Sequence, residues 1–301
     1  MCRKSRSGAW ISQGGGPCYR QHGMPEGDTI FRAARRMQQA LGGKVVTRFE
    51  SMFPQLNRID VDAPVSGRIV HQILSRGKHL LIEFSGDLTL RTHMRMNGSW
   101  HLYRPGEPWR RPRADMRIVI QSSDFVAVGF NIPVAEFHDR HSLERQRDLQ
   151  RIGPDFLDAA FDETEALSRL RARSATPIAE ALLNQRVVAG IGNVFKSEVL
   201  FTCGVYPFAP AGSLPDGKLL DLIRSARKLM ALNVRSEHDG SITTYSGFRR
   251  TTGRSDPAER LFVYGRRSKP CRRCGTAIEY EKRGLDARST YWCPACQAAP
   301  G

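Results

Sequence analysis

The sequence predicts an α+β protein of more than one domain, and three observations lead to this prediction. Residues 44–137 contain short β-branched or aromatic runs separated by Gly, Pro, Ser and Asp, which is typical of strands. Residues 176–234 carry apolar side chains at three- and four-residue spacing, which is typical of helices. Four of the seven cysteines form two pairs near the C-terminus. A chain of 301 residues is long enough to bury a core in each of two domains.

The first 23 residues differ in composition from the rest. They are rich in Gly, Ser and Arg and show no helical or strand periodicity, so we expect a disordered extension over residues 1–23. Apolar residues then recur at helical spacing, at Ile30, Ala33, Ala34, Met37 and Leu41. A Gly-Gly pair at 42–43 ends the run. We therefore predict an amphipathic helix, with Asp28 or Thr29 as its N-cap.

The segment that follows is predicted to be a β-sandwich. Six short runs are strand-like: "KVVTRFE", "GRIVHQIL", "KHLLIEF", "LTLRTHM", "MRIVIQ" and "FVAVGF". Strands of this length and spacing favour a sandwich. Gly153 and Pro154 mark a domain boundary, after which helical patterns take over. The predicted helices are "TPIAEALLNQRVV", "NVFKSEVLF" and "GKLLDLIRSARKLMALNV".

The charge balance indicates a polyanionic partner. Lys and Arg total 46 against 30 Asp and Glu, a formal charge of +16, and the pI is near 10.1. This is the electrostatic footprint of a nucleic-acid binder; a merely basic soluble protein and a binder of anionic membranes are the alternatives. No apolar run approaches the roughly 20 residues that span a bilayer, and no signal peptide is evident. We expect a cytoplasmic protein without a membrane partner.

The cysteine pairs have the spacing of a structural zinc ribbon. Cys271 and Cys274, then Cys293 and Cys296, give C-x2-C-x18-C-x2-C. Four thiolates close a tetrahedral shell and leave no position for water, so one zinc ion is expected to fold the module without taking part in chemistry. Two accidental C-x2-C pairs, or a redox dithiol, are the alternatives. The remaining thiols, of Cys2, Cys18 and Cys203, are expected to be reduced.

A glycine turn separates two of the predicted helices. Gly190, Ile191, Gly192 and Asn193 lie between "QRVVA" and "VFKSEVLF". Glycines at such a junction permit close backbone approach and leave the N–H groups of the next helix free to meet a phosphate. On local grounds a plain helix–turn–helix connection is the better explanation of the pattern.

The presence of Pro25 and Glu26 at this position can be explained by helix structure or by catalysis. Proline suits the first turn of a helix, and a glutamate suits the positive end of the helix dipole. An N-terminal amine, however, titrates at about 7.7–8.0 and can attack a carbonyl-like carbon. If Met24 begins the working chain and is removed, Pro25 presents such an amine and Glu26 can move protons. Lys78 is by default a solvated lysine at a strand entry.

Five segments together resemble one family. They are "MPEGDT" (24–29), "SRGKHLLIEF" (75–84), "THMRMNGSW" (92–100), "QRVVAGIGNVFKSEVLF" (185–201), and "CRRCG" with "RSTYWCPACQ". The family comprises the formamidopyrimidine-DNA glycosylases and endonuclease VIII, enzymes of base-excision repair. After the extension over 1–23, which its composition predicts to be disordered, the resemblance implies three parts. They are a catalytic β-sandwich with flanking helices over 24–150, a helix-two-turns-helix DNA-binding domain over 151–258, and a zinc finger over 259–298. A monomer on damaged DNA is expected.

The resemblance also implies roles for individual residues. Pro25 is similar to the family's Schiff-base nucleophile and Glu26 to its general acid/base, while Lys78 matches the lysine linked to β-elimination. Arg288 matches the finger arginine tied to DNA binding and δ-elimination. DNA contacts are implied for His93, Asn193, Met96 (as the filler of the gap left by a flipped base) and Glu198 (as a further acid of the site). Such enzymes act on a base extruded from the duplex.

Two finer points follow from the resemblance. "PEGDT" and "NVFKSE" are more similar to the endonuclease VIII branch, which favours oxidised pyrimidines, and the region "GFNIPVAEF" lacks the Arg and Phe of the purine-directed branch. A free amine on Pro25 requires either that Met24 is the true start or that residues 1–24 are trimmed.

The rival interpretations are a non-catalytic zinc-dependent DNA-binding protein with Pro25 blocked by the extension, and an RNA-associated zinc-ribbon protein.

Overall fold

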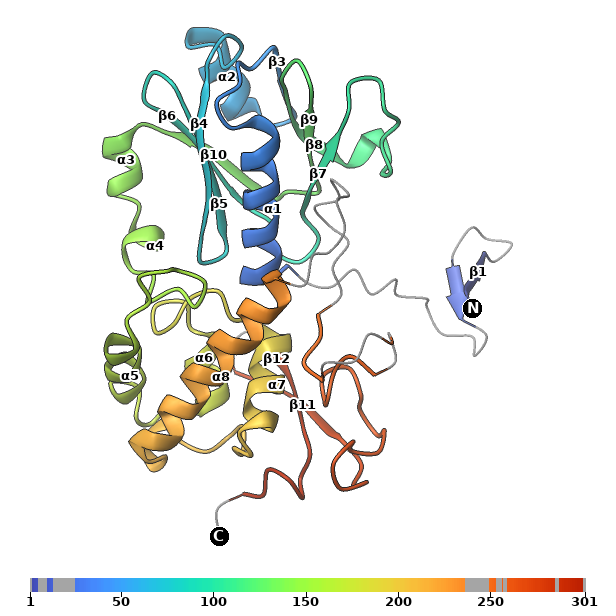
Figure 1. Cartoon of the computed structure of the whole chain (residues 1–301), viewed down its shortest axis with the longest axis vertical. Coiled ribbons are helices and arrows are strands. Elements are labelled where there is room, and N and C mark those ends of the chain that lie inside the picture. Colours follow the sequence, from blue (N-terminus) through green and yellow to red (C-terminus); the bar gives the residue numbers. More distant parts are fainter. Residues whose placement is uncertain are drawn as a thin grey trace.

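The computed structural model describes two short strands at residues 2–4 and 10–12, and then residues 25–235, 249–252, 256, 259–284 and 287–299. Figure 1 shows a sheet region above and a helical region below, with a small hairpin region beside the helices. Helix α1 (Gly27–Leu41) packs on strands of the upper region and also contacts helix α8 (Asp216–Arg235) of the lower one. The start of α1 therefore lies at the junction of the two regions.

The expectation of disorder over residues 1–23 differs from the structure in two stretches. Strands β1 (Cys2–Lys4) and β2 (Trp10–Ser12) pair in antiparallel register. The other residues of the extension, among them Cys18 and Met24, lie outside the described part of the chain.

The upper region is two four-stranded antiparallel sheets, which confirms the predicted sandwich. One sheet has the order β10-β6-β5-β4 and the other β3-β8-β9-β7. The strands of the first are β4 (Val70–Arg76), β5 (His79–Phe84), β6 (Leu88–His93) and β10 (Val134–His138). The strands of the second are β3 (Arg48–Ser51), β7 (Ser99–Tyr103), β8 (Met116–Gln121) and β9 (Val126–Phe130).

One apolar core joins the two sheets to α1. The helix contributes a stripe at helical spacing that includes Ile30, Met37 and Leu41, and both sheets contribute alternate side chains such as Leu80 and Ile118. The turn from β4 to β5 contains Gly77 at φ 60°, and Lys78 follows it at the entry to β5. The core thus fixes the strand end from which Lys78 projects.

One α-helix and two strands of this region were not predicted. Helix α2 (Pro54–Asp62) buries only Leu56, so it has no apolar stripe to reveal it. In strand β7, buried and exposed side chains do not alternate, because the last four residues of "SWHLY" are all buried. Strand β10 follows a proline in "IPVAEF" and is not among the six strand-like runs of the sequence.

The lower region is helical, as predicted, although the helix limits differ. After the short helices α3 (Arg140–Glu144) and α4 (Arg147–Gln150) come α5 (Glu163–Arg171), α6 (Ile178–Leu183), α7 (Asn193–Thr202) and α8. Helix α6 ends at Leu183, five residues before the predicted end, because Asn184 has extended backbone angles. Helix α7 begins at Asn193, directly after the glycine turn.

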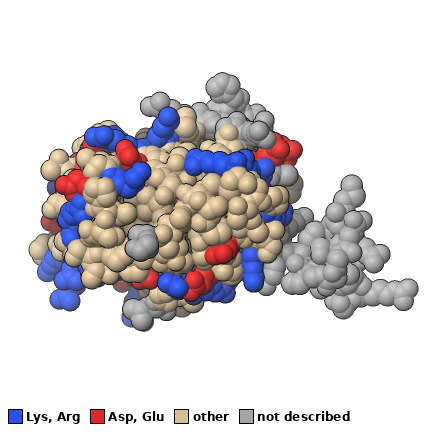
Figure 2. All heavy atoms as spheres, turned by 90° about the horizontal axis from the view of Figure 1, so that it is seen from below, with Lys and Arg blue, Asp and Glu red and all other residues tan. Residues whose placement is uncertain are grey.

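A hairpin of β11 (Glu279–Arg283) and β12 (Arg288–Trp292) completes the described chain. It packs on α7 through a small core that contains Phe201, Val263 and Ile278 together with cysteine side chains. No helix in the described residues is long and apolar enough to cross a membrane. On the lower face of the molecule, seen in Figure 2, Lys and Arg lie mainly around the margin and acidic residues are fewer.

Candidate active site

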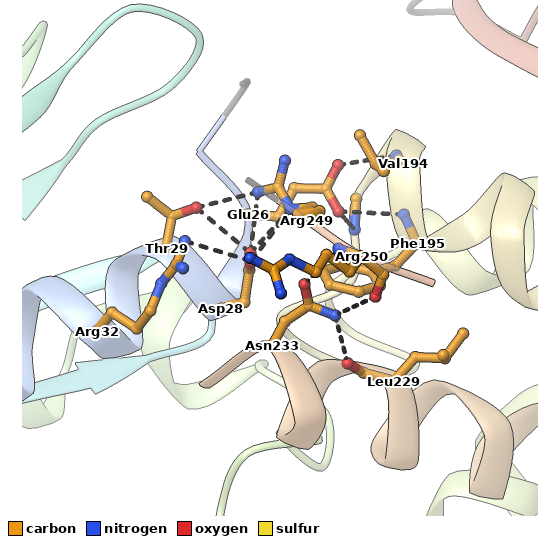
Figure 3. A network of polar contacts seen from close by, with 11 residues as sticks. Glu26, Asp28, Thr29, Arg32, Val194, Phe195, Leu229, Asn233, Arg249 and Arg250 are labelled. Carbon is orange, nitrogen blue, oxygen red and sulfur yellow. Dashed lines mark hydrogen bonds and ion pairs between the residues drawn. The ribbon is translucent and has the colours of Figure 1, made fainter. Parts of the chain in front are cut away.

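The carboxylate of Glu26 caps a helix of the other domain. One oxygen accepts a hydrogen bond from Val194 N at 2.8 Å, and the other accepts from Gly192 N at 3.2 Å and Phe195 N at 3.3 Å. Glu26 is fully buried, and its carboxylate meets the positive end of the α7 dipole. The expectation that these N–H groups are free for a phosphate is therefore wrong, because a carboxylate of this chain already occupies them (Figure 3).

Glycines make this contact possible. A Cβ on Gly192 would lie 2.4 Å from the carboxyl carbon of Glu26, and a Cβ on Gly27 would lie 2.7 Å from the backbone of Gly190. Gly190 has φ 92°, in the left-handed region that favours glycine, and its carbonyl accepts a 2.7 Å hydrogen bond from Gly27 N. The "PEG" and "GIG" segments thus fit together only because their glycines lack side chains.

Substitution of Gly192 by alanine is expected to destabilise the protein, since the new methyl group must displace a buried carboxylate. Overpacking of this kind costs roughly 1–3 kcal/mol of unfolding free energy. Gly217→Ala is the matched control, because its Cβ would meet nothing within 4 Å. Denaturant unfolding of the two variants measures the difference; equal stabilities would contradict the close contact at Gly192.

A buried ion pair lies beside Glu26. The guanidinium of Arg249 donates to both oxygens of Asp28 at 2.9–3.2 Å and to Thr29 Oγ1 at 3.1 Å. Burial alone raises the pKa of Asp28, but the charges of Arg249 and Arg32 outweigh it and hold that pKa below its usual value. Asp28 is therefore not the N-cap of α1; Glu26 occupies that position, and Asp28 binds arginines instead (Figure 3).

Helix α8 holds the backbone next to Arg249. Asn233 donates to the carbonyl of Arg250 at 2.9 Å and accepts from Arg250 N at 2.8 Å. The guanidinium of Arg249 also lies over the ring of Phe195, 5.5 Å from its centroid. Arg249 thus connects the first turn of α1 with α7 and α8.

Lys78 lies within electrostatic reach of the same group. Burial lowers the pKa of Lys78 to about 8; Glu26 opposes this shift, and the charges of Arg288 and Arg249 add to it. A pKa near 8 leaves about a tenth of the amine unprotonated at pH 7. Lys78 is therefore an amine that can exchange protons near neutral pH.

His93 at the end of β6 is uncharged at neutral pH. Burial lowers its pKa to about 4, and the charge of Lys78 acts in the same direction. His93 Nδ1 accepts a 3.0 Å hydrogen bond from Arg95 N, which leaves Nε2 to carry the proton. Met96, in the following turn, is half-exposed. His93 can thus donate one hydrogen bond without carrying a charge, and Met96 exposes an apolar side chain.

Two residues of α7 have different surroundings from those expected. Asn193 is buried, and its side-chain oxygen accepts from Lys196 Nζ at 3.4 Å. Glu198 is also fully buried, and it accepts from the backbone N–H groups of Phe262, Val263 and Tyr264 at 2.8–2.9 Å and from the hydroxyl of Thr251. Because these groups surround it, Glu198 anchors the segment before the cysteine module and has no surface on which to contact DNA.

The four paired cysteines converge. The sulfur atoms of Cys271, Cys274, Cys293 and Cys296 all lie within 4.8 Å of one another. Cys203, by contrast, is a free thiol whose pKa is raised by burial. The four-thiol cluster has the donor set and compactness of a structural metal site.

Known proteins are similar to this chain over nearly its whole length. Family models match residues 24–141 (formamidopyrimidine-DNA glycosylase N-terminal domain), 152–246 (formamidopyrimidine-DNA glycosylase H2TH domain) and 268–299 (zinc finger found in FPG and IleRS). The "probable endonuclease 8 2" of Streptomyces coelicolor is 42% identical over 92% of this chain and 95% of its own length. The "DNA-(apurinic or apyrimidinic site) lyase Nei2" of Mycolicibacterium smegmatis is 38% identical over 92% and 100%.

The chain belongs to the formamidopyrimidine-DNA glycosylase family. The solved complex of Lactococcus lactis Fpg with DNA that contains an abasic site has the same fold, with a TM-score of 0.76 at 23% identity, and the match covers 91% of this chain and all of that one. The helical region of this family member is thus the H2TH domain, and the hairpin with its cysteines is the zinc finger.

Sequence reasoning missed several residues of the site. Arg249, Lys196 and Tyr264 were not singled out, although Arg249 and Tyr264 interact electrostatically with each other and both with Glu26. Arg249 and Tyr264 are far from Glu26 along the chain, and neither lies in a sequence motif that indicates a function. The one available signal for Lys196 was its place in the apolar stretch "NVFKSEVLF".

Proposed function

We propose that this chain is a bifunctional DNA glycosylase and abasic-site lyase of base-excision repair. The observation that carries the proposal is the buried Glu26 carboxylate, which α7 holds next to Pro25 and within electrostatic reach of Lys78. An acid, a neighbouring amine position and a lysine with a lowered pKa are the groups that base release and elimination require. The names of the curated relatives, endonuclease 8 and abasic-site lyase, support it.

In the proposed reaction, the amine of Pro25 attacks C1′ of the damaged nucleotide. The bond from C1′ to the base breaks, and Glu26 passes the proton of the attacking nitrogen to the departing base. A proton from the solvent then goes to O4′ as the C1′–O4′ bond breaks, and the opened sugar is left with a cationic iminium between C1′ and the Pro25 nitrogen. This iminium accepts electrons, so loss of a proton from C2′ breaks the bond to the 3′ phosphate. Lys78 is proposed to assist this β-elimination and Arg288 the δ-elimination that follows.

The positions of other charged groups fit a DNA partner. Lys78, Lys196 and Arg249 each interact electrostatically with Glu26, and Arg288 interacts with both lysines. Within the described residues, these four basic groups meet three carboxylates, those of Glu26, Asp28 and Glu180, so the site has an excess of positive charge. His93 and Asn193 are proposed to contact the phosphate backbone and Met96 to fill the gap in the stack. We propose zinc as the metal of the four-thiol cluster, because a closed shell of four thiolates is its common structural site. Metal analysis is expected to give one zinc per chain.

The function is tested with matched duplexes that contain an oxidised pyrimidine, an oxidised purine, an abasic site or no damage. Protein that begins at Pro25 is expected to cleave the first and third at least tenfold faster than the second, and to leave undamaged DNA intact. Faster cleavage of the purine substrate would overturn the pyrimidine preference alone. Absence of cleavage on all four would overturn the enzymatic function and favour a DNA-binding role.

A further inference from the structure

Lys196 is a fully buried lysine in the first turn of α7. Its exposed fraction is 0%, and its Nζ donates to Ser289 O at 2.8 Å, Thr290 Oγ1 at 2.8 Å and Asn193 Oδ1 at 3.4 Å. These three acceptors, all within the described part of the chain, carry no charge. Lys196 therefore places a cation in the interior and binds it through neutral oxygens.

Burial of a charged amine costs free energy, and this cost lowers the pKa of the amine. Burial lowers the pKa of Lys196 to about 7; Glu26 and Glu180 oppose the shift, while Arg288 adds to it. An apolar side chain would avoid this penalty but could not bind the two β12 oxygens. The contacts to β12 are thus the feature that a lysine specifically supplies at this position.

These contacts act on the strand that carries Arg288. Ser289 and Thr290 directly follow Arg288 on β12, and the next residue, Tyr291, donates its N–H to Ser197 Oγ at 3.4 Å. Two adjacent residues of α7 therefore bind three successive residues of β12. Because the same helix binds Glu26 at its N-terminus, α7 fixes the acid and the finger strand relative to each other.

We propose that Lys196 is a positioning residue that holds β12 on α7 and so sets where Arg288 stands beside the Pro25–Glu26 end of the site. The inference rests on the proposed function, in which Arg288 serves δ-elimination. Lys196 has no exposed surface, so it acts through Arg288 and the strand rather than by touching the DNA. Its removal should alter the second elimination more than base release.

The test compares Lys196→Met, Arg288→Ala and the double variant on a duplex with an abasic site, using chains that begin at Pro25. Methionine keeps most of the length and removes the charge and the donors. In Lys196→Met, the ratio of δ- to β-elimination product is expected to fall about tenfold, while borohydride trapping changes less than about threefold. Lys228→Met, at an exposed lysine of α8, is the control for net charge.

The double variant separates positioning from a second, independent effect. If Lys196 acts through Arg288, the double variant should have the product ratio of Arg288→Ala, whereas independent roles would multiply the two losses. Thr290→Val removes only one acceptor of the lysine and should shift the ratio in the same direction, which keeps the test decisive if Lys196→Met folds poorly. Zinc content, measured in every variant, reports whether the finger is intact.

A wild-type product ratio in both Lys196→Met and Thr290→Val would overturn the inference. Wild-type protein that leaves the abasic strand uncut would instead contradict the proposed function. Multiplicative losses in the double variant would also overturn positioning through Arg288.

Discussion

Protein that begins at Pro25 is expected to form a borohydride-stable adduct with DNA that contains an abasic site, whereas protein that keeps residues 1–24 is not. The physical reason is the state of the Pro25 nitrogen. A terminal amine has a free electron pair and a pKa of about 7.7–8.0, but a nitrogen in a peptide bond shares its electron pair with the carbonyl. We expect the rates of covalent trapping to differ by on the order of 10³-fold or more.

The comparison needs one protein in two states. A full-length chain with a protease site before Pro25 supplies both, since cleavage changes only the N-terminus, and intact mass reports which form is present. Equal trapping of the uncleaved form would contradict this prediction, and trapping that is then lost in Lys78→Met would assign the nucleophile to Lys78.

Glu26→Gln is expected to have the second-largest effect. Glutamine cannot protonate a leaving base, and removal of a general acid costs about 10²–10⁴ in rate. The structure adds a further penalty, because both carboxylate oxygens accept N–H groups of α7, so the amide nitrogen of glutamine would face a donor. The variant should therefore lose base release and also some stability.

Two substrates separate the chemical loss from the structural one. Single-turnover release of an oxidised base should fall by the full factor, whereas cleavage of a preformed abasic site needs no base protonation and should fall much less. Glu83→Gln, on β5 and half-buried, is the control for loss of a carboxylate. Equal losses on both substrates would mean that Glu26 serves folding alone.

Local patterns in the sequence were sufficient to predict most of the fold. The stripe from Ile30 to Leu41 predicted α1, and the runs "MRIVIQ" and "FVAVGF" predicted β8 and β9 to within a residue. Each of these elements buries apolar side chains at regular spacing, and this spacing can be recognised in the sequence. Helix α2 was missed because it buries one residue.

The site was less accessible to such reasoning, because its contacts join residues far apart in the chain. Glu26 and Gly192 are 166 residues apart, and Asp28 and Arg249 are 221 apart. Local rules assigned Glu26 to the dipole of its own helix and Asp28 to an N-cap, and both side chains serve other partners. Glu198 was placed at the DNA by resemblance, with a helix-surface charge as the alternative, and it binds the backbone of residues 262–264 instead. The roles of Pro25, Lys78, Arg288, His93, Asn193 and Met96 rest on resemblance and stay predictions.

The cap that α7 receives from Glu26 also has a consequence for the order in which the protein matures. During synthesis the sandwich emerges first, yet the partners of Glu26 and Asp28 lie at residues 192–195 and at Arg249. Until those residues leave the ribosome, Glu26 lacks the N–H groups that bind its carboxylate, and Asp28 has Arg32 of its own helix but not Arg249. The reactive end of the molecule is thus assembled late, and a truncated chain that ends before Arg249 should lack the buried ion pair that holds the first turn of α1.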